Sequence, residues 1–143
     1  GQVLARYPLP ACKGPTGLAY IPDGRLIAAC GNGAVRIVDA VTGAVMAGVT
    51  IGAFPDAVIY DPKRALAMVP SGVSGTLTVI ALSGSANNMV VDTVPTQVGA
   101  RTGAVDTLSG RVYLPAAEYN PPAGPNQRPT PKPGTFNVLV LDR

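Results

Sequence analysis

Few residues of this chain belong to the types that catalyse reactions. Its 143 residues include no His and one Glu, Glu118. The lack of His removes the commonest metal ligand and general base, and it excludes a Ser-His-Asp triad or a His-ligated haem within the chain. Glu118 is a candidate general acid or base, but no second carboxylate stands near it in the sequence. We therefore predict no catalytic residue, no metal site and no cofactor.

The other candidate site residues are basic or aromatic and are suited to binding. Lys13 and Arg101 stand at or near the starts of two predicted strands, where they are placed to bind an anion. Tyr119 and Arg128 share one long loop with Glu118, and we count all three as ligand-binding candidates. The alternative is that these five side chains are solvated loop residues.

A strand-rich repeat that occurs three times carries these residues. Equivalent positions are Leu26, Leu66 and Val112, so successive copies are 40 and 46 residues apart. Periods of this length with four strand signals in each copy indicate the blades of a β-propeller. The predicted strands, A to D in each copy, are 17–21, 26–30, 34–39 and 44–51, then 57–60, 65–69, 76–82 and 89–94, then 103–106, 111–115 and 136–141.

The composition agrees with an all-β globular chain. Apolar residues make up 47% and charged residues 13%, with 17 Gly and 15 Pro that indicate many turns. The net charge is +3, but the 11 basic residues are spread singly except for Lys63-Arg64, which argues against a nucleic-acid partner. The sequence contains no run of 18 apolar residues, so we expect no transmembrane helix. Gly1 opens directly into a strand-like run, so we expect no signal peptide in this sequence.

The repeat predicts one segment of three blades, at about 10–52, 53–94 and 95–143. The third blade lacks strand D, whereas residues 1–5 match residues 43–47 at the start of strand D in the first copy. We therefore expect residues 1–9 to complete the third blade; the alternative is that the chain ends there by chance. Known propellers have about four to eight blades. We expect the missing blades to come from a second copy, as a homodimer, or from a longer chain of six to eight blades.

Residues 15–26, PTGLAYIPDGRL, followed by VRIVD and Thr42-Gly43, resemble the YVTN or YncE-like β-propeller repeat. The pattern is clear in the first copy and degenerate in the other two. The resemblance implies a periplasmic or secreted protein that acts as a non-catalytic binding or scaffold module. Because related propellers carry haem, quinoprotein partners or lactonase sites, the alternative is an enzyme whose channel site needs the completed ring.

Propeller topology places the D–A and B–C loops on one face, where we expect a small-molecule or protein ligand. Cys12 and Cys30 both lie near this face, and an extracytoplasmic propeller would join them in a disulfide. The alternative is two separate thiols, with Cys30 as a small core residue.

One B–C loop departs from the repeat. The loop after strand 111–115 is 15 residues longer than its counterpart in the second copy and holds six prolines. We expect it to be extended, to add no strand and to form a lid or an arm. The alternative is a tolerated surface insertion.

Overall fold

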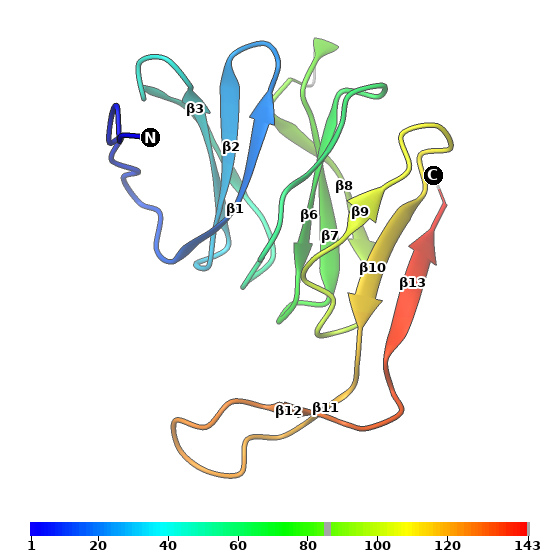
Figure 1. Cartoon of the computed structure of the whole chain (residues 1–143). Coiled ribbons are helices and arrows are strands. Elements are labelled where there is room, and N and C mark those ends of the chain that lie inside the picture. Colours follow the sequence, from blue (N-terminus) through cyan, green and yellow to red (C-terminus); the bar gives the residue numbers. More distant parts are fainter. Residues whose placement is uncertain (85–86, 143) are drawn as a thin grey trace.

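The computed structural model describes residues 1–84 and 87–142, which form antiparallel sheets and, within these ranges, no α-helix (Figure 1). The first sheet has the order β1-β2-β3-β4 and the second the order β5-β6-β7-β8. The third has the order β13-β10-β9, and β11 pairs with β12 apart from it. The strands are β1 (Pro15–Ile21), β2 (Arg25–Cys30), β3 (Ala34–Asp39), β4 (Val45–Thr50), β5 (Ile59–Asp61), β6 (Leu66–Ser71), β7 (Thr76–Ala81), β8 (Met89–Pro95), β9 (Ala104–Val105), β10 (Val112–Ala116), β11 (Tyr119–Asn120), β12 (Thr130–Pro131) and β13 (Asn137–Leu141).

The strands of the three sheets lie within two residues of the predicted bounds, and the fold class, an all-β propeller segment, is confirmed. The turns explain this agreement because their signals are local. The N–H of Gly24 donates to the carbonyl oxygen of Ile21 at 3.0 Å, and Gly24 has a φ of +93°, which a glycine adopts without strain. We call the three sheets blades 1, 2 and 3.

The core consists of two layers, each between neighbouring blades. Ile27 and Ile37 of blade 1 pack with Val69 and Ile80 of blade 2. On the opposite face of blade 2, a second cluster includes Leu77 with Val112, Leu114 and Leu139 of blade 3. The middle blade is thus covered on both faces, which explains the nearly continuous apolar runs of β6 and β7.

The two end blades each turn an apolar face away from the middle blade. In β13, Leu139 and Leu141 pack toward blade 2. Because successive side chains in a strand alternate between faces, Val138 and Val140 point the other way, and they are 60% and 59% exposed. Blade 1 likewise exposes Leu18, at 63%. These faces are what an incomplete ring of blades leaves open.

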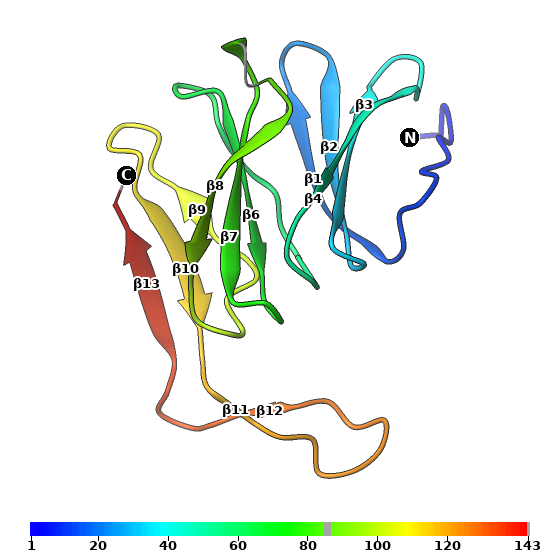
Figure 2. The ribbon, with the colours of Figure 1, turned by 180° about the vertical axis from the view of Figure 1, so that it is seen from behind.

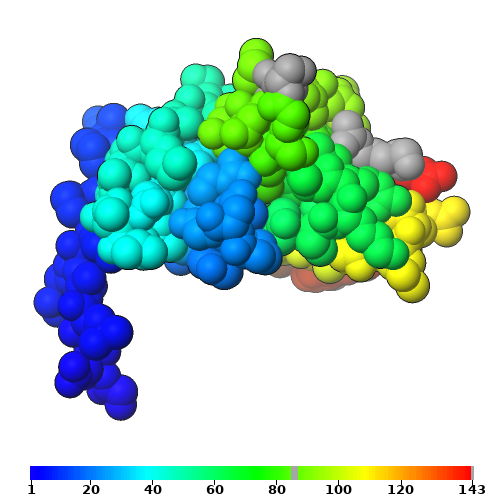
Figure 3. Space-filling model, turned by 90° about the horizontal axis from the view of Figure 1, so that it is seen from above, coloured from blue at the N-terminus to red at the C-terminus, as the bar shows by residue number. Residues whose placement is uncertain are grey.

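The N-terminal segment lies beside blade 1 and forms no strand within the chain (Figures 1 and 2). Its first residues project beyond the body of the molecule (Figure 3). The Tyr7 hydroxyl donates to the Val41 carbonyl oxygen at 2.7 Å. The pairing expected between residues 1–9 and the third blade is therefore not made within one chain, and β13 has β10 as its one neighbour among the described strands.

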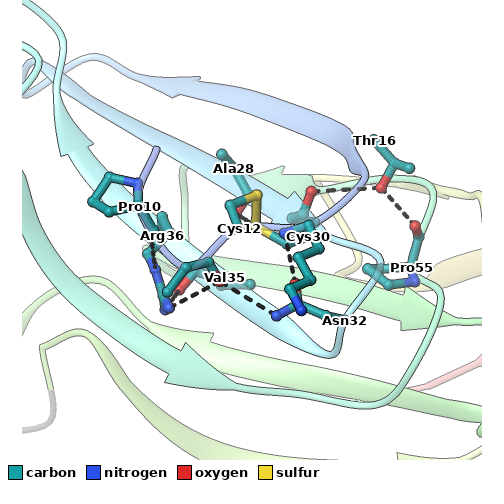
Figure 4. The surroundings of a disulfide bond; sticks show 12 residues. Pro10, Cys12, Thr16, Ala28, Cys30, Asn32, Val35, Arg36 and Pro55 are labelled. Carbon is teal, nitrogen blue, oxygen red and sulfur yellow. Dashed lines mark hydrogen bonds between the residues drawn. A yellow bond between two sulfur atoms is a disulfide. The ribbon is translucent and has the colours of Figure 1, made fainter. Parts of the chain in front are cut away.

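A disulfide and an arginine fasten this segment to blade 1 (Figure 4). Cys12 and Cys30 are joined, with their Cα atoms 5.3 Å apart, which is within the range for a disulfide. The Arg36 guanidinium donates to the carbonyl oxygens of Pro10 and Ala11. Residues 10–12 are thereby held against β2 and β3 of blade 1.

We expect loss of the disulfide to lower the free energy of unfolding by about 2–3 kcal/mol, because it closes a loop with a sequence separation of 18 residues. Chemical denaturation of oxidised protein and of the Cys12→Ser/Cys30→Ser variant measures this difference. The variant treated with reductant is the control, since reductant has no disulfide to act on there. Equal stability of oxidised and variant protein would contradict the prediction.

A buried arginine joins blades 1 and 2 at the opposite end of the sheets. Arg25, with 10% of its side chain exposed, forms an ion pair with Asp23. It also donates to the carbonyl oxygen of Leu82 at 2.7 Å and to the side-chain oxygens of Asn87 and Asn88 at 2.9 and 2.7 Å. Its equivalent in blade 3, Arg111, pairs with Asp142 of its own blade and has a side chain that is 52% exposed. Arg25 therefore makes a contact between blades, whereas Arg111 has no following blade to contact.

Candidate functional site

The loops that join successive blades and the B–C loops lie on one face of the molecule (Figures 1 and 2). The proline-rich loop leaves blade 3 on this face and runs beneath the sheets toward blade 1. We call residues 117–136 the proline arm. The face that propeller topology assigns to ligands is therefore the face that this arm covers.

A cleft of about 780 Å³ opens between these loops and the proline arm. The D–A connections of blades 1–2 and 2–3, the B–C loop of blade 2 and the arm all contribute to it. Three of the five predicted binding residues, Arg101, Tyr119 and Arg128, line it together. Its lining is Phe54, Asp56, Gly72, Val73, Val98, Gly99, Arg101, Tyr119, Arg128 and Pro129.

Arg101 is held in place by an ion pair and by the backbone. Its Nε lies 3.0 Å from Oδ2 of Asp56, and the N–H of Asp56 donates to its carbonyl oxygen at 3.3 Å. A Cβ on Gly72 would stand 2.9 Å from the Arg101 Cβ. Only a glycine at position 72 allows this approach. The two D–A connections thus place Asp56 and Arg101 side by side.

Tyr119 positions the arm against the body of the molecule. A Cβ on Gly99, which has a φ of +97°, would lie 2.7 Å from the Tyr119 Cε2. The ring therefore covers a backbone position that a larger residue could not occupy. Arg128 enters the cleft from the far end of the arm, and its guanidinium makes no hydrogen bond or ion pair to residues 1–84 or 87–142.

Glu118 lines a second, smaller pocket of about 410 Å³ on the other side of Tyr119. Its Oε2 accepts from the Nζ of Lys132 at 2.9 Å, and both side chains are largely exposed. The amide of Asn137 donates to Oε1 of Gln97 at 3.2 Å in the same pocket. This arrangement ties the base of the proline arm together and neutralises the charge of Glu118.

Lys13 does not line either pocket. It follows Cys12 beside blade 1, where its backbone N–H donates to Oδ1 of Asn32 at 3.0 Å. The Asn32 amide in turn donates to the carbonyl oxygen of Ala11 at 3.3 Å. The structure therefore places Lys13 with the disulfide and apart from the Arg101 cleft.

The proline arm contains two short strands, which corrects the expectation that its composition adds none. β11 and β12 pair antiparallel, and the Lys132 N–H donates to the Glu118 carbonyl oxygen at 2.8 Å. Pro129, Pro131 and Pro133 have no backbone N–H, but they alternate with residues that keep theirs. The remaining N–H groups can therefore hydrogen-bond to a strand along one edge of this segment. As expected, the arm does not join a blade.

The carboxylates with lowered pKa values lie in the turns at the opposite face. Hydrogen bonds from the backbone N–H and hydroxyl of Thr42 lower the pKa of Asp39. The Ser109 hydroxyl does the same for the pKa of Asp106, and the Arg25 side chain lowers that of Asp23. These three carboxylates fasten turns of the blades. None of them lines the cleft.

Within residues 1–84 and 87–142, no three side chains of the His, Cys, Asp and Glu types gather in a way that could hold a metal ion. No helix in those ranges is long and apolar enough to cross a bilayer.

No protein-family profile matches the chain, and no curated protein matches its sequence. Solved structures do match. Hydrazine synthase of Kuenenia stuttgartiensis has a TM-score of 0.65 at 18% identity, over 82% of this chain and 33% of that one. Dihydro-heme d1 dehydrogenase NirN in complex with DHE has a TM-score of 0.59 at 17% identity, over 89% and 29%. A putative 6-phosphogluconolactonase of Bacteroides uniformis has a TM-score of 0.58 at 13% identity, over 82% and 39%.

These neighbours are β-propeller proteins, and identities this low show a shared fold alone. The chain spans about a third of the length of each of them. The three blades therefore correspond to a part of those propellers.

The sequence analysis did not identify the apolar residues that line the cleft. Phe54, Val73 and Val98 come from three loops and are each 60–62% exposed. One signal was present: Phe54 is one of two Phe residues and stands in a predicted D–A loop, where an aromatic side chain has no core to fill. The loops that carry Val73 and Val98 gave no such signal.

Proposed function

We propose that the chain is a non-catalytic binding module of a YVTN/YncE-like β-propeller, whose ligand occupies the cleft beneath the proline arm. The observation that supports this most is the convergence of Arg101, Tyr119 and Arg128 on one cleft from two separate loops. Its volume of about 780 Å³ lies within the usual range of ligand sites. Loops on a rigid sheet scaffold are the usual place for such sites.

An oxidising location forms part of the proposal. A disulfide between Cys12 and Cys30 persists in the periplasm or outside the cell and is rare in the cytosol. A periplasmic or secreted protein with an apolar cleft open to solvent is suited to bind a diffusible ligand or a segment of another protein.

The proposal also includes further blades that complete the ring. The exposed face with Val138 and Val140 favours a neighbouring blade that covers it. The unpaired edge of β13 favours a fourth strand for blade 3 itself. A second copy would supply that neighbour and use its residues 1–9 as the missing strand D; the other source is the rest of a longer chain. A homodimer of this kind would have six blades, within the known range.

We expect the proline arm to contribute to binding and not to folding. Replacing residues 119–134 by Gly-Asn-Gly, the sequence of the short turn at 31–33, should shift the melting temperature by no more than about 2 °C, because the arm contributes little to the two buried clusters. Small-molecule fragments that bind the whole protein in ligand-observed NMR should lose binding.

The matched control is Lys13→Ala, which changes a candidate residue on the same face but outside the cleft. It should keep the fragment binding. If the shortened protein unfolds, or if it retains the same bound fragments, the arm is not a recognition element. Turnover of a bound fragment would favour the alternative, an enzyme that needs the completed ring.

A further inference from the structure

The cleft has an apolar wall that loops of a folded protein seldom expose. Phe54, Val73 and Val98 are each about 60% exposed and lie around one hollow, although they come from different loops. Single exposed apolar residues are common, whereas three gathered in a concave site indicate that something apolar covers them. The body of the ligand is therefore expected to be apolar or aromatic.

The same cleft carries an uncompensated positive charge. Asp56 pairs with Arg101 at 3.0 Å and balances one guanidinium. Arg128 lines the same cleft, and its guanidinium has no acceptor among the described residues. The cleft therefore holds two cations and one anion. A guanidinium binds a carboxylate or a sulfonate through paired, charge-assisted hydrogen bonds.

Close packing within the chain positions two of the side chains that line the cleft. Gly72 and Gly99 form backbone stretches of the lining, against which Arg101 and Tyr119 lie. Arg128 is followed by Pro129, whose ring restricts the backbone at the end of the arm. A site that is already ordered loses less conformational entropy on binding.

We propose that this cleft binds a small amphipathic organic anion, with its acidic group at Arg128 and its aromatic or aliphatic body against Phe54, Val73 and Val98. This inference rests on the proposed function, since it names the ligand class of the same cleft. Arg101 remains paired with Asp56, while Arg128 supplies the free guanidinium.

Two probes with the same apolar body test the inference. Anilinonaphthalene sulfonate carries an acidic group, and phenylnaphthylamine is its neutral counterpart; both become fluorescent in apolar sites. We expect Arg128→Gln to weaken the sulfonate probe about tenfold, which corresponds to the loss of one charge-assisted interaction. The neutral probe should be unaffected. Phe54→Ala should weaken both probes.

The matched control is Lys63→Gln, which removes an equal charge from the exposed turn between β5 and β6, at the end of the sheets opposite the cleft. Fluorescence from the open blade faces is common to all variants and does not enter the comparison. If the neutral probe depends on Phe54 and on the arm, but Arg128→Gln leaves the sulfonate probe unchanged, the anion inference is overturned and the binding module stands. If neither probe depends on Phe54 or on the arm, the proposed function itself fails.

Discussion

Deletion of residues 1–6 is expected to prevent the chain from forming a defined dimer. The resulting monomer should be prone to aggregate. These residues project beyond the three blades, and the structure shows them without a strand partner. We propose that they form most of strand D, which residues 1–9 supply to the last blade of a second copy, against β13. Without them β13 keeps an unpaired edge, which promotes disordered association. Size-exclusion chromatography with light scattering gives the mass of each species.

This deletion is designed to leave blade 1 intact. It keeps Tyr7, whose hydroxyl donates to the Val41 carbonyl oxygen, and the disulfide at Cys12. Val140→Lys should also prevent association, since Val140 is 59% exposed on the open face of blade 3. Val91→Lys is the matched control, because Val91 is 47% exposed on β8, the outermost strand of the middle blade. Unchanged mass in the deletion variant, or equal effects of the two lysines, would contradict strand exchange.

The second large effect is expected at Arg25. Arg25→Met should lower the free energy of unfolding by about 2–3 kcal/mol, because the Leu82 carbonyl oxygen and the side chains of Asn87 and Asn88 lose their donor. Methionine keeps most of the apolar stem of the side chain. Relief of the desolvation of the buried guanidinium offsets part of the loss. Urea denaturation at constant protein concentration measures the difference.

Arg111→Met provides the comparison for this prediction. Arg111 occupies the equivalent position in blade 3, but its partner Asp142 belongs to the same blade and both side chains are largely exposed. Ion pairs of this kind contribute at most about 1 kcal/mol. If Arg25→Met costs no more than Arg111→Met, the bridge between blades 1 and 2 does not stabilise the fold.

Much of the fold could be predicted from the sequence, because its signals are local. The turn at Pro22-Asp23-Gly24 and the spacing of Leu26, Leu66 and Val112 locate the strands without knowledge of distant contacts. The arm shows the limit of this approach. Its prolines indicate an extended segment, but the pairing of β11 with β12 depends on which N–H groups remain between them.

Contacts between blades could not be predicted in the same way. Arg25 meets Leu82, Asn87 and Asn88 across 57 to 63 positions of sequence, in a turn where the repeat is degenerate. The cleft could be predicted in part. Arg101, near the start of a strand, and Arg128, in the long loop, are both binding candidates from the sequence, and both line the cleft. Its apolar wall was missed because a loop sequence does not show the direction of its side chains.

The mass of the whole, oxidised chain in solution tests most directly whether these three blades are part of a ring. Sedimentation equilibrium over a range of concentrations should show a reversible species of twice the 14.5 kDa mass of one chain. The associated species should unfold cooperatively, because each copy would cover the open faces of the other. A monodisperse monomer that unfolds in one cooperative transition at every concentration would contradict the ring.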